Sequence, residues 1–386
     1  MSNHELRYIP FNRAGFLGRE LEYVSECISN GHISGDGPFT SKCSRLIESA
    51  LGVPKCLLTT SGTHALELAA LLLDIAIDDE VIVPSYTFVS TINAFVLHGA
   101  RPVFVDIRPD TLNIDERLIE QAITPSTRAI IAVHYAGVAC EMDTIMDIAS
   151  RHGVPVVEDN AHGLFARYRG RPLGTFGAFS IQSFHETKNF TCGEGGALLL
   201  NRESDVARAE VLREKGTDRS QFYRGLVNKY GWVDKGSSYL PSDILAAFLY
   251  AQLEARDRVQ AYRQEIWNRY HDSLAGWAAG HGVKLMHVPD HCEQSYHMFY
   301  MLMPSLEVRT AFINHLKEAD ISAVFHYLPL HSSAMGVRLG GKKGDCPVTE
   351  SVSDRMVRLP FYNDLTKDQQ QTVIDRILTF DPAVVS

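Results

Sequence analysis

Residues 129–162, AIIAVHYAGVACEMDTIMDIASRHGVPVVEDNAH, contain one complete strand–helix–strand unit. The short apolar runs 129–134 and 154–159 predict buried strands, and the amphipathic stretch 141–151 predicts the helix between them. Two neighbouring strands joined by a helix run parallel, because the connection returns the chain to the same end of the sheet. The second strand ends at Asp159, so a carboxylate is expected at the carboxyl edge of that sheet.

The same alternation of strands and helices extends over residues 55–200. The other predicted strands are 55–60, 81–84, 101–107, 176–184 and 196–200, and the other predicted helices lie at about 63–73, 87–98 and 115–122. This pattern indicates an α/β domain with a largely parallel sheet that helices cover on both faces. Because the last two strands have no helix between them, part of the sheet is expected to be antiparallel.

A long helical pattern from about 242 to 277, preceded by Pro241, predicts the bridge to a second domain. Beyond it we expect strands near 295–303 and 321–327, helices near 306–319 and 366–380, and a capping box at Thr366 and Gln369. The expected organisation is a large domain over 12–255 and a smaller α+β domain over 256–386, with segment 1–11 packed near the smaller one.

Composition excludes several classes of protein. The net charge of −9 argues against a nucleic-acid partner, because contact with a phosphate backbone requires a basic surface. The seven cysteines contain no C-x-x-C pair, which argues against a disulfide framework or a zinc ribbon and fits a reducing compartment. No signal peptide is recognised, and the longest apolar stretch, 65–77, is too short to cross a bilayer. We therefore expect a cytoplasmic protein without a metal or a membrane segment.

Reactive side chains are expected at the carboxyl ends of the predicted strands, where open α/β sheets bind ligands. After the first strand, the turn Thr60-Ser61-Gly62-Thr63 precedes a helix. Free backbone N–H groups and the helix dipole suit this turn to a phosphate. A plain N-cap by Ser61 or Thr63 is an equally good interpretation of the turn alone.

Three further clusters follow later strands. An aromatic of the segment 84–88 would stack on a flat ring, although most such aromatics are core residues. Asp159 is suited to pair with the protonated ring nitrogen of pyridoxal 5'-phosphate (PLP), although an Asp after a strand is more often a helix cap. Lys188 is placed to form a Schiff base, with Ser183 reaching the cofactor phosphate, whereas a lone loop lysine is usually a solvated charge. The order of these groups along the chain makes a PLP site the preferred hypothesis.

These motifs resemble those of the DegT/DnrJ/StrS nucleotide-sugar aminotransferases, which are PLP enzymes of fold type I. The matching motifs are S-G-T-H-A-L (61–66), P-S-Y-T-F (84–88), V-E-D-N-A-H (157–162), S-F-H-E-T-K-N (183–189) and G-E-G-G (193–196). The likeness covers nearly the whole chain, including S-G-D-G-P-F-T (34–40) and H-Y-L-P-L-H (326–331). It is greatest to members that make dTDP-4-amino-4,6-dideoxygalactose.

The resemblance implies a role for each site residue. Lys188 and Asp159 would be the catalytic pair, with Lys188 holding PLP and moving the proton. The residues implied to hold the cofactor are Gly62, Thr63 and Ser183 at the phosphate, Phe88 on the ring, and His162 near the ring hydroxyl. Many relatives have Gln where this chain has His162. Asn228 or Ser238 of a neighbouring subunit would complete the phosphate site, which implies a homodimer with shared active sites.

The implied reaction transfers an amino group from glutamate to C4 of dTDP-4-keto-6-deoxyglucose. The product is a dTDP-4-amino-4,6-dideoxyhexose of galactose or glucose configuration, as used in lipopolysaccharide and O-antigen synthesis. Candidate substrate contacts are Tyr86, Arg219, His326 and His331; a solvated basic loop and structural histidines are the simpler interpretations. A PLP-dependent sugar dehydratase and a non-catalytic PLP-binding regulator are the alternative functions. The presence of Lys188 favours transamination, because relatives that became dehydratases have His there.

Overall fold

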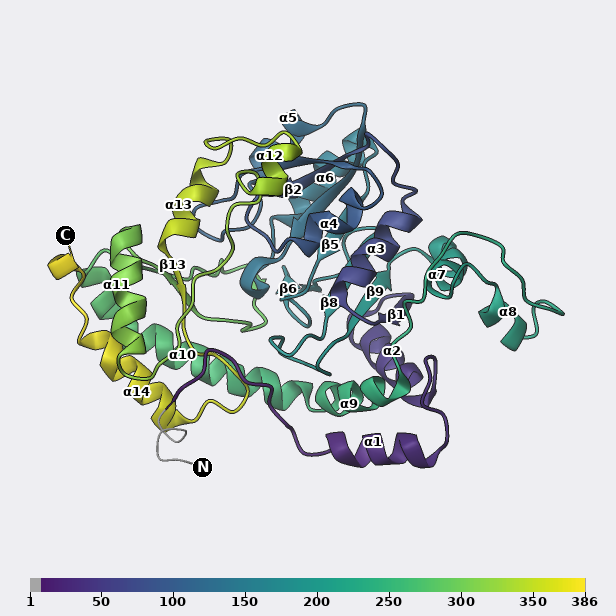
Figure 1. Cartoon of the computed structure of the whole chain (residues 1–386), viewed down its shortest axis with the longest axis horizontal. Coiled ribbons are helices and arrows are strands. Elements are labelled where there is room, and N and C mark those ends of the chain that lie inside the picture. Colours follow the sequence, from purple (N-terminus) through teal and green to yellow (C-terminus); the bar gives the residue numbers. More distant parts are fainter. Residues whose placement is uncertain (1–7, 386) are drawn as a thin grey trace.

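A seven-stranded sheet organises the computed structural model, which describes residues 8–385 (Figure 1). Its strands lie in the order β1 (Lys55–Thr59), β9 (Gly196–Leu200), β8 (Phe179–Ser183), β5 (Val156–Asp159), β4 (Thr127–Val133), β2 (Glu80–Pro84) and β3 (Arg101–Val105). Every strand predicted between residues 55 and 200 is present. Only β9 runs antiparallel to its two neighbours, so all the other strands have their carboxyl ends at the same edge.

Apolar side chains of the central strands are buried on both faces of the sheet. Along β4, Ile130 and Ala132 belong to one apolar core, while Ile131 and Val133 belong to the core on the opposite face. The first core is covered by α5 (Ile119–Ala122) and α6 (Met142–His152), and the second by α3 (Gly62–Leu72), α4 (Ser90–Val96) and α7 (Val206–Arg213). Continuous apolar runs such as 129–133 therefore form strands that helices cover on both sides.

The helices α1 (Glu20–Ser29), α2 (Pro38–Leu51) and α9 (Asp243–Glu254) pack together beside the β1 edge of the sheet (Figure 1). The fully buried Asp243 accepts hydrogen bonds from the backbone N–H groups of Phe39 and Thr40 at 3.1 and 2.7 Å. This carboxylate satisfies the open N-terminus of α2, so the first residue of α9 fixes a helix that precedes it by about 200 positions in the chain.

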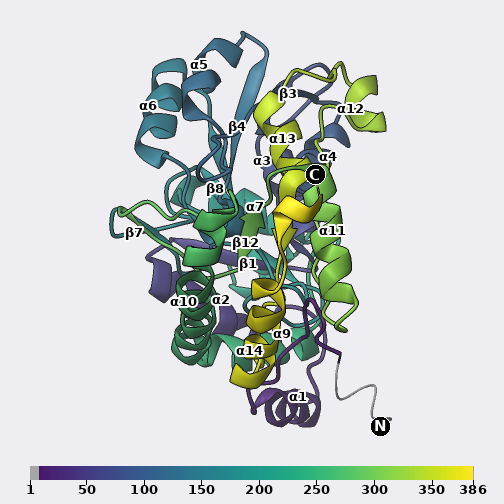
Figure 2. The same cartoon turned by 90° about the vertical axis from the view of Figure 1, so that its left-hand side faces the viewer.

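The long helix expected over 242–277 is two helices, α9 and α10 (Arg256–Gly280), which meet at Ala255. Ala255 has φ −87° and ψ 10°, outside the α-helical range. The two helices have different partners, since α9 packs on α1 and α2 while α10 packs on α14 (Lys367–Leu378), beside which it runs in Figure 2. The break coincides with the domain boundary at 255/256, which we retain as a proposal.

The C-terminal part is a small sheet with helices around it. Its strands are β10 (Lys284–Leu285), β12 (Tyr300–Leu302) and β13 (Met356–Arg358), and its further helices are α11 (Leu306–Lys317), α12 (Ala334–Arg338) and α13 (Pro347–Arg355). The predicted helices 306–319 and 366–380 are confirmed, as is the capping box of Thr366 and Gln369. The prediction of a strand over 321–327 was wrong, because only isolated bridges form there.

Several contacts join this small part to the rest of the chain. A third sheet pairs β11 (Cys292–Glu293) with β6 (Arg167–Tyr168), which also pairs with β7 (Arg171–Pro172). The Asp106 carboxylate accepts the backbone N–H groups of Val348 and Thr349, both at 2.8 Å, at the start of α13. Ile9 pairs with Ile321, so the described end of the N-terminal segment packs against the small part; residues 1–7 of the segment expected there lie outside the described residues. Within residues 8–385, no helix has the length and apolar character to span a membrane.

Candidate functional site

A cavity of about 840 Å³ lies at the carboxyl edge of the central sheet. It collects residues that follow β1, β2, β5 and β8, and it is closed on another side by residues of the small part. The predicted site residues that line it are Gly62, Thr63, Phe88, Asp159, His162, Ser183, Lys188 and His326. The common direction of the strands therefore brings together groups that are far apart in the sequence.

The turn before α3 has the properties of an anion site. Ser61 caps the helix by accepting the N–H of His64 at 3.1 Å, as the N-cap interpretation predicts. The N–H groups of Gly62 and Thr63 at the first turn have no acceptor among the described residues. Two glycines keep the turn close to its neighbours: a Cβ on Gly62 would lie 3.1 Å from Ser183 Cβ, and one on Gly196 would lie 2.4 Å from the Gly62 nitrogen. The free N–H groups and the helix dipole suit a phosphate here.

Asp159 is held in a fixed orientation at the floor of the cavity. Its side chain is buried; Thr91 donates to Oδ2 at 2.7 Å and the backbone N–H of Ala161 donates to Oδ1 at 3.2 Å. No helix begins at this residue, so Asp159 is not a helix cap. Each carboxylate oxygen keeps a free lone pair. A carboxylate held in this way is suited to accept a hydrogen bond from a protonated ring nitrogen.

Lys188 lines the same cavity, from the loop that follows β8. Its amine has no hydrogen-bond or ion-pair partner among residues 8–385. Burial lowers the pKa of Lys188 to about 8, the charge of Asp159 opposes this shift, and the charge of Arg358 adds to it. A lysine with this pKa is partly unprotonated near neutral pH, which an amine needs in order to act as a nucleophile or a base.

His162 is neutral, and its proton position follows from its partners. The backbone N–H of Ala136 donates to Nδ1 of His162 at 3.2 Å, so the ring proton resides on Nε2. Burial, with the charges of Lys188 and Arg358, holds the pKa of His162 well below its usual range. Its ring stacks on His297, with centroids 4.1 Å apart and planes at 16°. His162 is therefore a neutral hydrogen-bond donor at the cavity wall.

Phe88 supplies an aromatic face. It is 56% exposed, although a large apolar side chain is normally buried, and it lines the cavity near Tyr327, whose ring centroid is 6.2 Å away. PLP requires a phosphate site of free backbone N–H groups, an aromatic face for its ring, a carboxylate for its ring nitrogen and a lysine amine. The residues of this cavity thus fit that cofactor.

Two predicted substrate contacts are excluded from the cavity. Tyr86 is buried, and its hydroxyl donates to the backbone oxygen of His326 at 3.0 Å. His331 is completely buried, with Ser85 Oγ 2.6 Å from its Nδ1 and Glu350 Oε1 2.9 Å from its Nε2. Neither ring lines the cavity, so the assignment of both residues to substrate is corrected: Tyr86 is a core residue and His331 a structural one.

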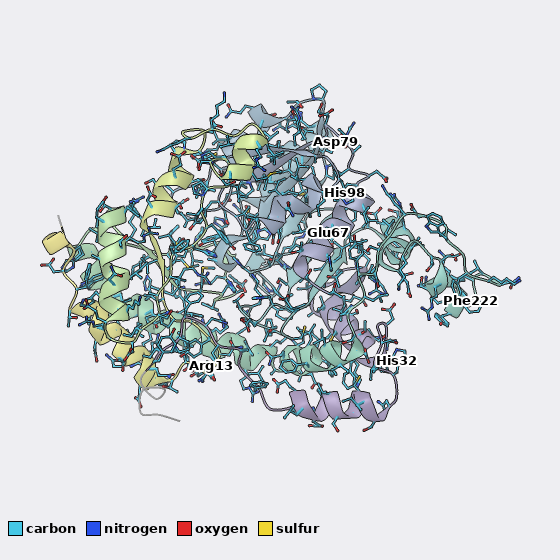
Figure 3. The ribbon with its side chains drawn as sticks, in the orientation of Figure 1. Arg13, His32, Glu67, Asp79, His98 and Phe222 are labelled. Atoms are coloured by element: carbon cyan, nitrogen blue, oxygen red, sulfur yellow. The ribbon has the colours of Figure 1, made fainter. Side chains whose placement is uncertain are left out.

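The other predicted residues outside the cavity belong to the arm, which we define as residues 213–238. The arm includes α8 (Arg219–Tyr223) and projects from the body (Figure 1), and Phe222, which is labelled in Figure 3, lies on it. Arg219, Asn228 and Ser238 are on the arm, and none of them lines the cavity of the same chain. Arg219 instead forms an ion pair with Glu214 at 3.1 Å. A single chain therefore does not bring these three residues to the site.

The lining residues that the sequence analysis did not single out include His297, Tyr327 and Arg358. His297 falls within a predicted strand, and Tyr327 follows the predicted substrate contact His326, but neither pattern indicates that the side chain faces a cavity. Arg358 belongs to β13, a strand that the sequence pattern did not predict. Among residues 8–385, no group of three or more His, Cys, Asp or Glu side chains is arranged to hold a metal ion.

The pKa of Lys188 can be tested on the cofactor-free chain. We expect the rate at which added PLP condenses with the protein to rise with pH through a midpoint near 8, because only the unprotonated amine reacts. Replacement Asp159→Asn should move the midpoint lower still, since the charge of Asp159 raises the pKa. Stopped-flow absorbance across a pH series measures both. A midpoint near 10.5, the ordinary value for a lysine, would contradict the burial argument.

Comparison with known proteins places this site in a family. The family model described as the DegT/DnrJ/EryC1/StrS aminotransferase family matches residues 17–378. The uncharacterised protein MJ1066 of Methanocaldococcus jannaschii is 36% identical over 378 residues, which cover 96% of this chain and 97% of that protein. The PLP form of Spr1654 from Streptococcus pneumoniae, described as a sugar aminotransferase, superposes with a TM-score of 0.90 at 28% identity, over 98% of this chain and 100% of that one. The aminotransferase TlmJ from Streptoalloteichus hindustanus gives a TM-score of 0.88 at 28% identity, over 96% and 98%.

Proposed function

The chain belongs to the DegT/DnrJ/EryC1/StrS aminotransferase family, and we propose that it transfers the amino group of glutamate to C4 of dTDP-4-keto-6-deoxyglucose. It is a PLP-dependent sugar aminotransferase of fold type I. The product of the proposed reaction is a dTDP-4-amino-4,6-dideoxyhexose, which would enter the synthesis of a surface polysaccharide in the cytoplasm. The family match and the presence of Lys188 favour this reaction over the dehydratase and regulatory alternatives.

Different residues of the cavity would bind the cofactor and transfer the proton. When bound, PLP supplies an electron-withdrawing ring that stabilises negative charge on the carbon that loses its proton. Gly62, Thr63 and Ser183 would hold its phosphate, and Phe88 would lie against its ring. His162 would donate from Nε2 to the ring hydroxyl, because its Nδ1 already accepts the N–H of Ala136. Asp159 would keep the ring nitrogen protonated.

Lys188 would move the proton from the donor carbon to the cofactor carbon that comes to carry the amino group. In the second half of the reaction it would move a proton from that cofactor carbon to C4 of the sugar. The observation that carries this assignment is an amine with no partner in the described chain, in the same cavity as Asp159 and with a pKa of about 8. An amine with this pKa exchanges a proton readily in both directions near neutral pH, and a reversible amino-group transfer requires both. His326 also lines the cavity, so it remains a candidate contact for the sugar.

The arm supports the proposal that the working unit is a homodimer. Neither Asn228 nor Ser238 lines the cavity of its own chain, while Tyr223, Trp232 and Val233 on the arm are 70, 84 and 57% exposed. Exposed large apolar side chains on a projecting segment are typical of an interface. A twofold axis would let each arm reach the cavity of the other subunit, where Asn228 or Ser238 would complete the phosphate site and Arg219 would meet the nucleotide.

Incubation with glutamate and dTDP-4-keto-6-deoxyglucose tests the reaction directly. We expect NMR of the product sugar to show an amine at C4 and 2-oxoglutarate to form in equal amount, and we expect Lys188→Ala to abolish both. The configuration at C4 is read from the ring proton couplings. Amination of a 3-keto sugar, with no product from the 4-keto sugar, would show that the proposed position is wrong.

Shared sites are tested by mixing two inactive variants. One variant carries Lys188→Ala, and the other carries Asn228→Ala together with Ser238→Ala. If each site takes residues from both chains, a mixed dimer contains one site with both lesions and one site with neither, so mixing should restore up to about half of the activity per mixed dimer. Light scattering of the wild type supplies the mass of the assembly. No recovery from subunits that demonstrably exchange, or a fully active monomer, would exclude the shared site.

A further inference from the structure

Arg358 is a cation without a counter-ion at the wall of the cavity. Its guanidinium forms no ion pair and no hydrogen bond with any described residue, and its Nε is buried without a partner. The nearest compensation is the ring of Phe11, whose centroid lies 4.5 Å from the guanidinium carbon. Among the described residues that line the cavity, Arg358 is the only arginine.

The backbone of Arg358 is fixed in place. Its N–H donates to the carbonyl of Val324 at 2.8 Å, and it is paired with Tyr300 in the register of β12 and β13. The side chain therefore projects from a sheet rather than from a loop. Its other neighbours are Tyr135, Tyr327 and Tyr86, which are neutral hydroxyl groups at physiological pH. No carboxylate is among them, and none of the described residues forms an ion pair with this guanidinium.

A buried guanidinium without a counter-ion raises the free energy of the folded chain. The free energy of removing a guanidinium from water is recovered only when an anion or several hydrogen-bond acceptors meet it. The burial of Arg358 lowers its pKa, which has the same physical cause. Because the planar guanidinium presents parallel N–H donors, the ligand that matches it best is a carboxylate or a phosphate held by two hydrogen bonds. The geometry thus points to an anionic group of a substrate.

We propose that Arg358 binds the α-carboxylate of the amino-acid donor. The inference rests on the proposed transfer from an amino acid such as glutamate. In that reaction the donor amine must reach the place of the Lys188 amine, and the α-carboxylate is attached to the same carbon as the amine. A cation that serves the donor must therefore lie beside Lys188.

The electrostatic neighbourhood supports this position over one that serves the nucleotide. Arg358 lines the same cavity as Lys188, His162 and His297, and its charge lowers the pKa of all three, so Arg358 lies within electrostatic reach of the reactive amine. The diphosphate of a nucleotide sugar is separated from C4 by the width of the sugar ring. The cations that bind this diphosphate are therefore needed farther from Lys188, where the arm of a partner subunit would supply Arg219. Arg358 and the arm would then serve different substrates.

The two half-reactions separate these roles experimentally. The variants are Arg358→Met, Arg358→Lys and, as a matched control on the same segment, Arg355→Gln. Among the described residues, the side chain of Arg355 bonds only to the Ser351 carbonyl of its own helix. Single-turnover absorbance of the PLP-loaded enzyme with glutamate gives the donor affinity. The same measurement on the pyridoxamine-loaded enzyme with the keto sugar gives the sugar affinity. Calorimetric titration of the PLP-loaded enzyme with 2-oxoglutarate, which has the α-carboxylate but no amine, measures binding without turnover.

We expect Arg358→Met to weaken the affinity for glutamate and for 2-oxoglutarate by about 10- to 100-fold, the size of a lost charge-assisted hydrogen-bonded pair. Arg358→Lys should lose less of this affinity, and Arg355→Gln should bind both ligands as tightly as the wild type. The sugar half-reaction of Arg358→Met should stay close to wild type, and its melting temperature should not fall, because the replacement removes an uncompensated buried charge. Unchanged donor affinity would overturn the proposal, as would an equal or larger loss in the sugar half-reaction. If the wild type uses another L-amino acid, glutamate is the wrong donor, and the same comparison with that amino acid still decides the role of Arg358.

Discussion

Burial of the Lys188 amine in the same cavity as the Asp159 carboxylate is the interaction on which the site depends. Removal of water lowers the pKa of the amine, and the carboxylate limits this shift, so the balance brings the pKa to about 8. Without Asp159 the amine would lose its charge too readily, and without burial it would remain protonated. Thr91 and Ala161 hold Asp159, so its carboxylate has a fixed direction before any ligand binds. Preorganisation of this kind avoids a reorganisation cost during the reaction.

Strand direction explains how such distant residues meet. Every strand of the central sheet except β9 ends at the same edge, and the turns that follow β1, β2, β5 and β8 line one cavity. Close packing then adjusts the site: Gly196 allows β9 to start against the turn at Gly62, where a Cβ would clash with backbone. The small part adds the remaining wall, including His297, His326 and Arg358. The fold thus supplies cofactor contacts from the large sheet and further charged and polar groups from the small one.

Local patterns in the sequence were sufficient for the large sheet and for the residues that follow its strands. Apolar runs bounded by polar turns identify strands, and parallel connections fix which ends meet, so Asp159, Lys188 and the turn at Gly62 were found together. The same reasoning did not separate Phe88 from Tyr86, two residues earlier in the turn. Tyr86 is buried in the apolar core, where its hydroxyl bonds to the backbone of His326, a partner 240 residues away. His331 was misassigned for the same reason, since Ser85 and Glu350 hold it in the interior.

Arg358 shows a further limit of local patterns. The segment 356–358 is a strand only because it pairs with Tyr300–Leu302, and the lack of a counter-ion depends on everything packed around it. The break at Ala255 likewise follows from the different partners of α9 and α10 rather than from a Gly or Pro.

The assignment of the reactive lysine is the claim from which the rest of the account follows. Borohydride reduction of the PLP-loaded enzyme fixes the cofactor covalently to the amine that holds it, and mass spectrometry of the peptides identifies that amine. The account predicts the label on Lys188 alone, in the peptide that follows β8. A label on any other lysine, with Lys188 unmodified, would contradict it.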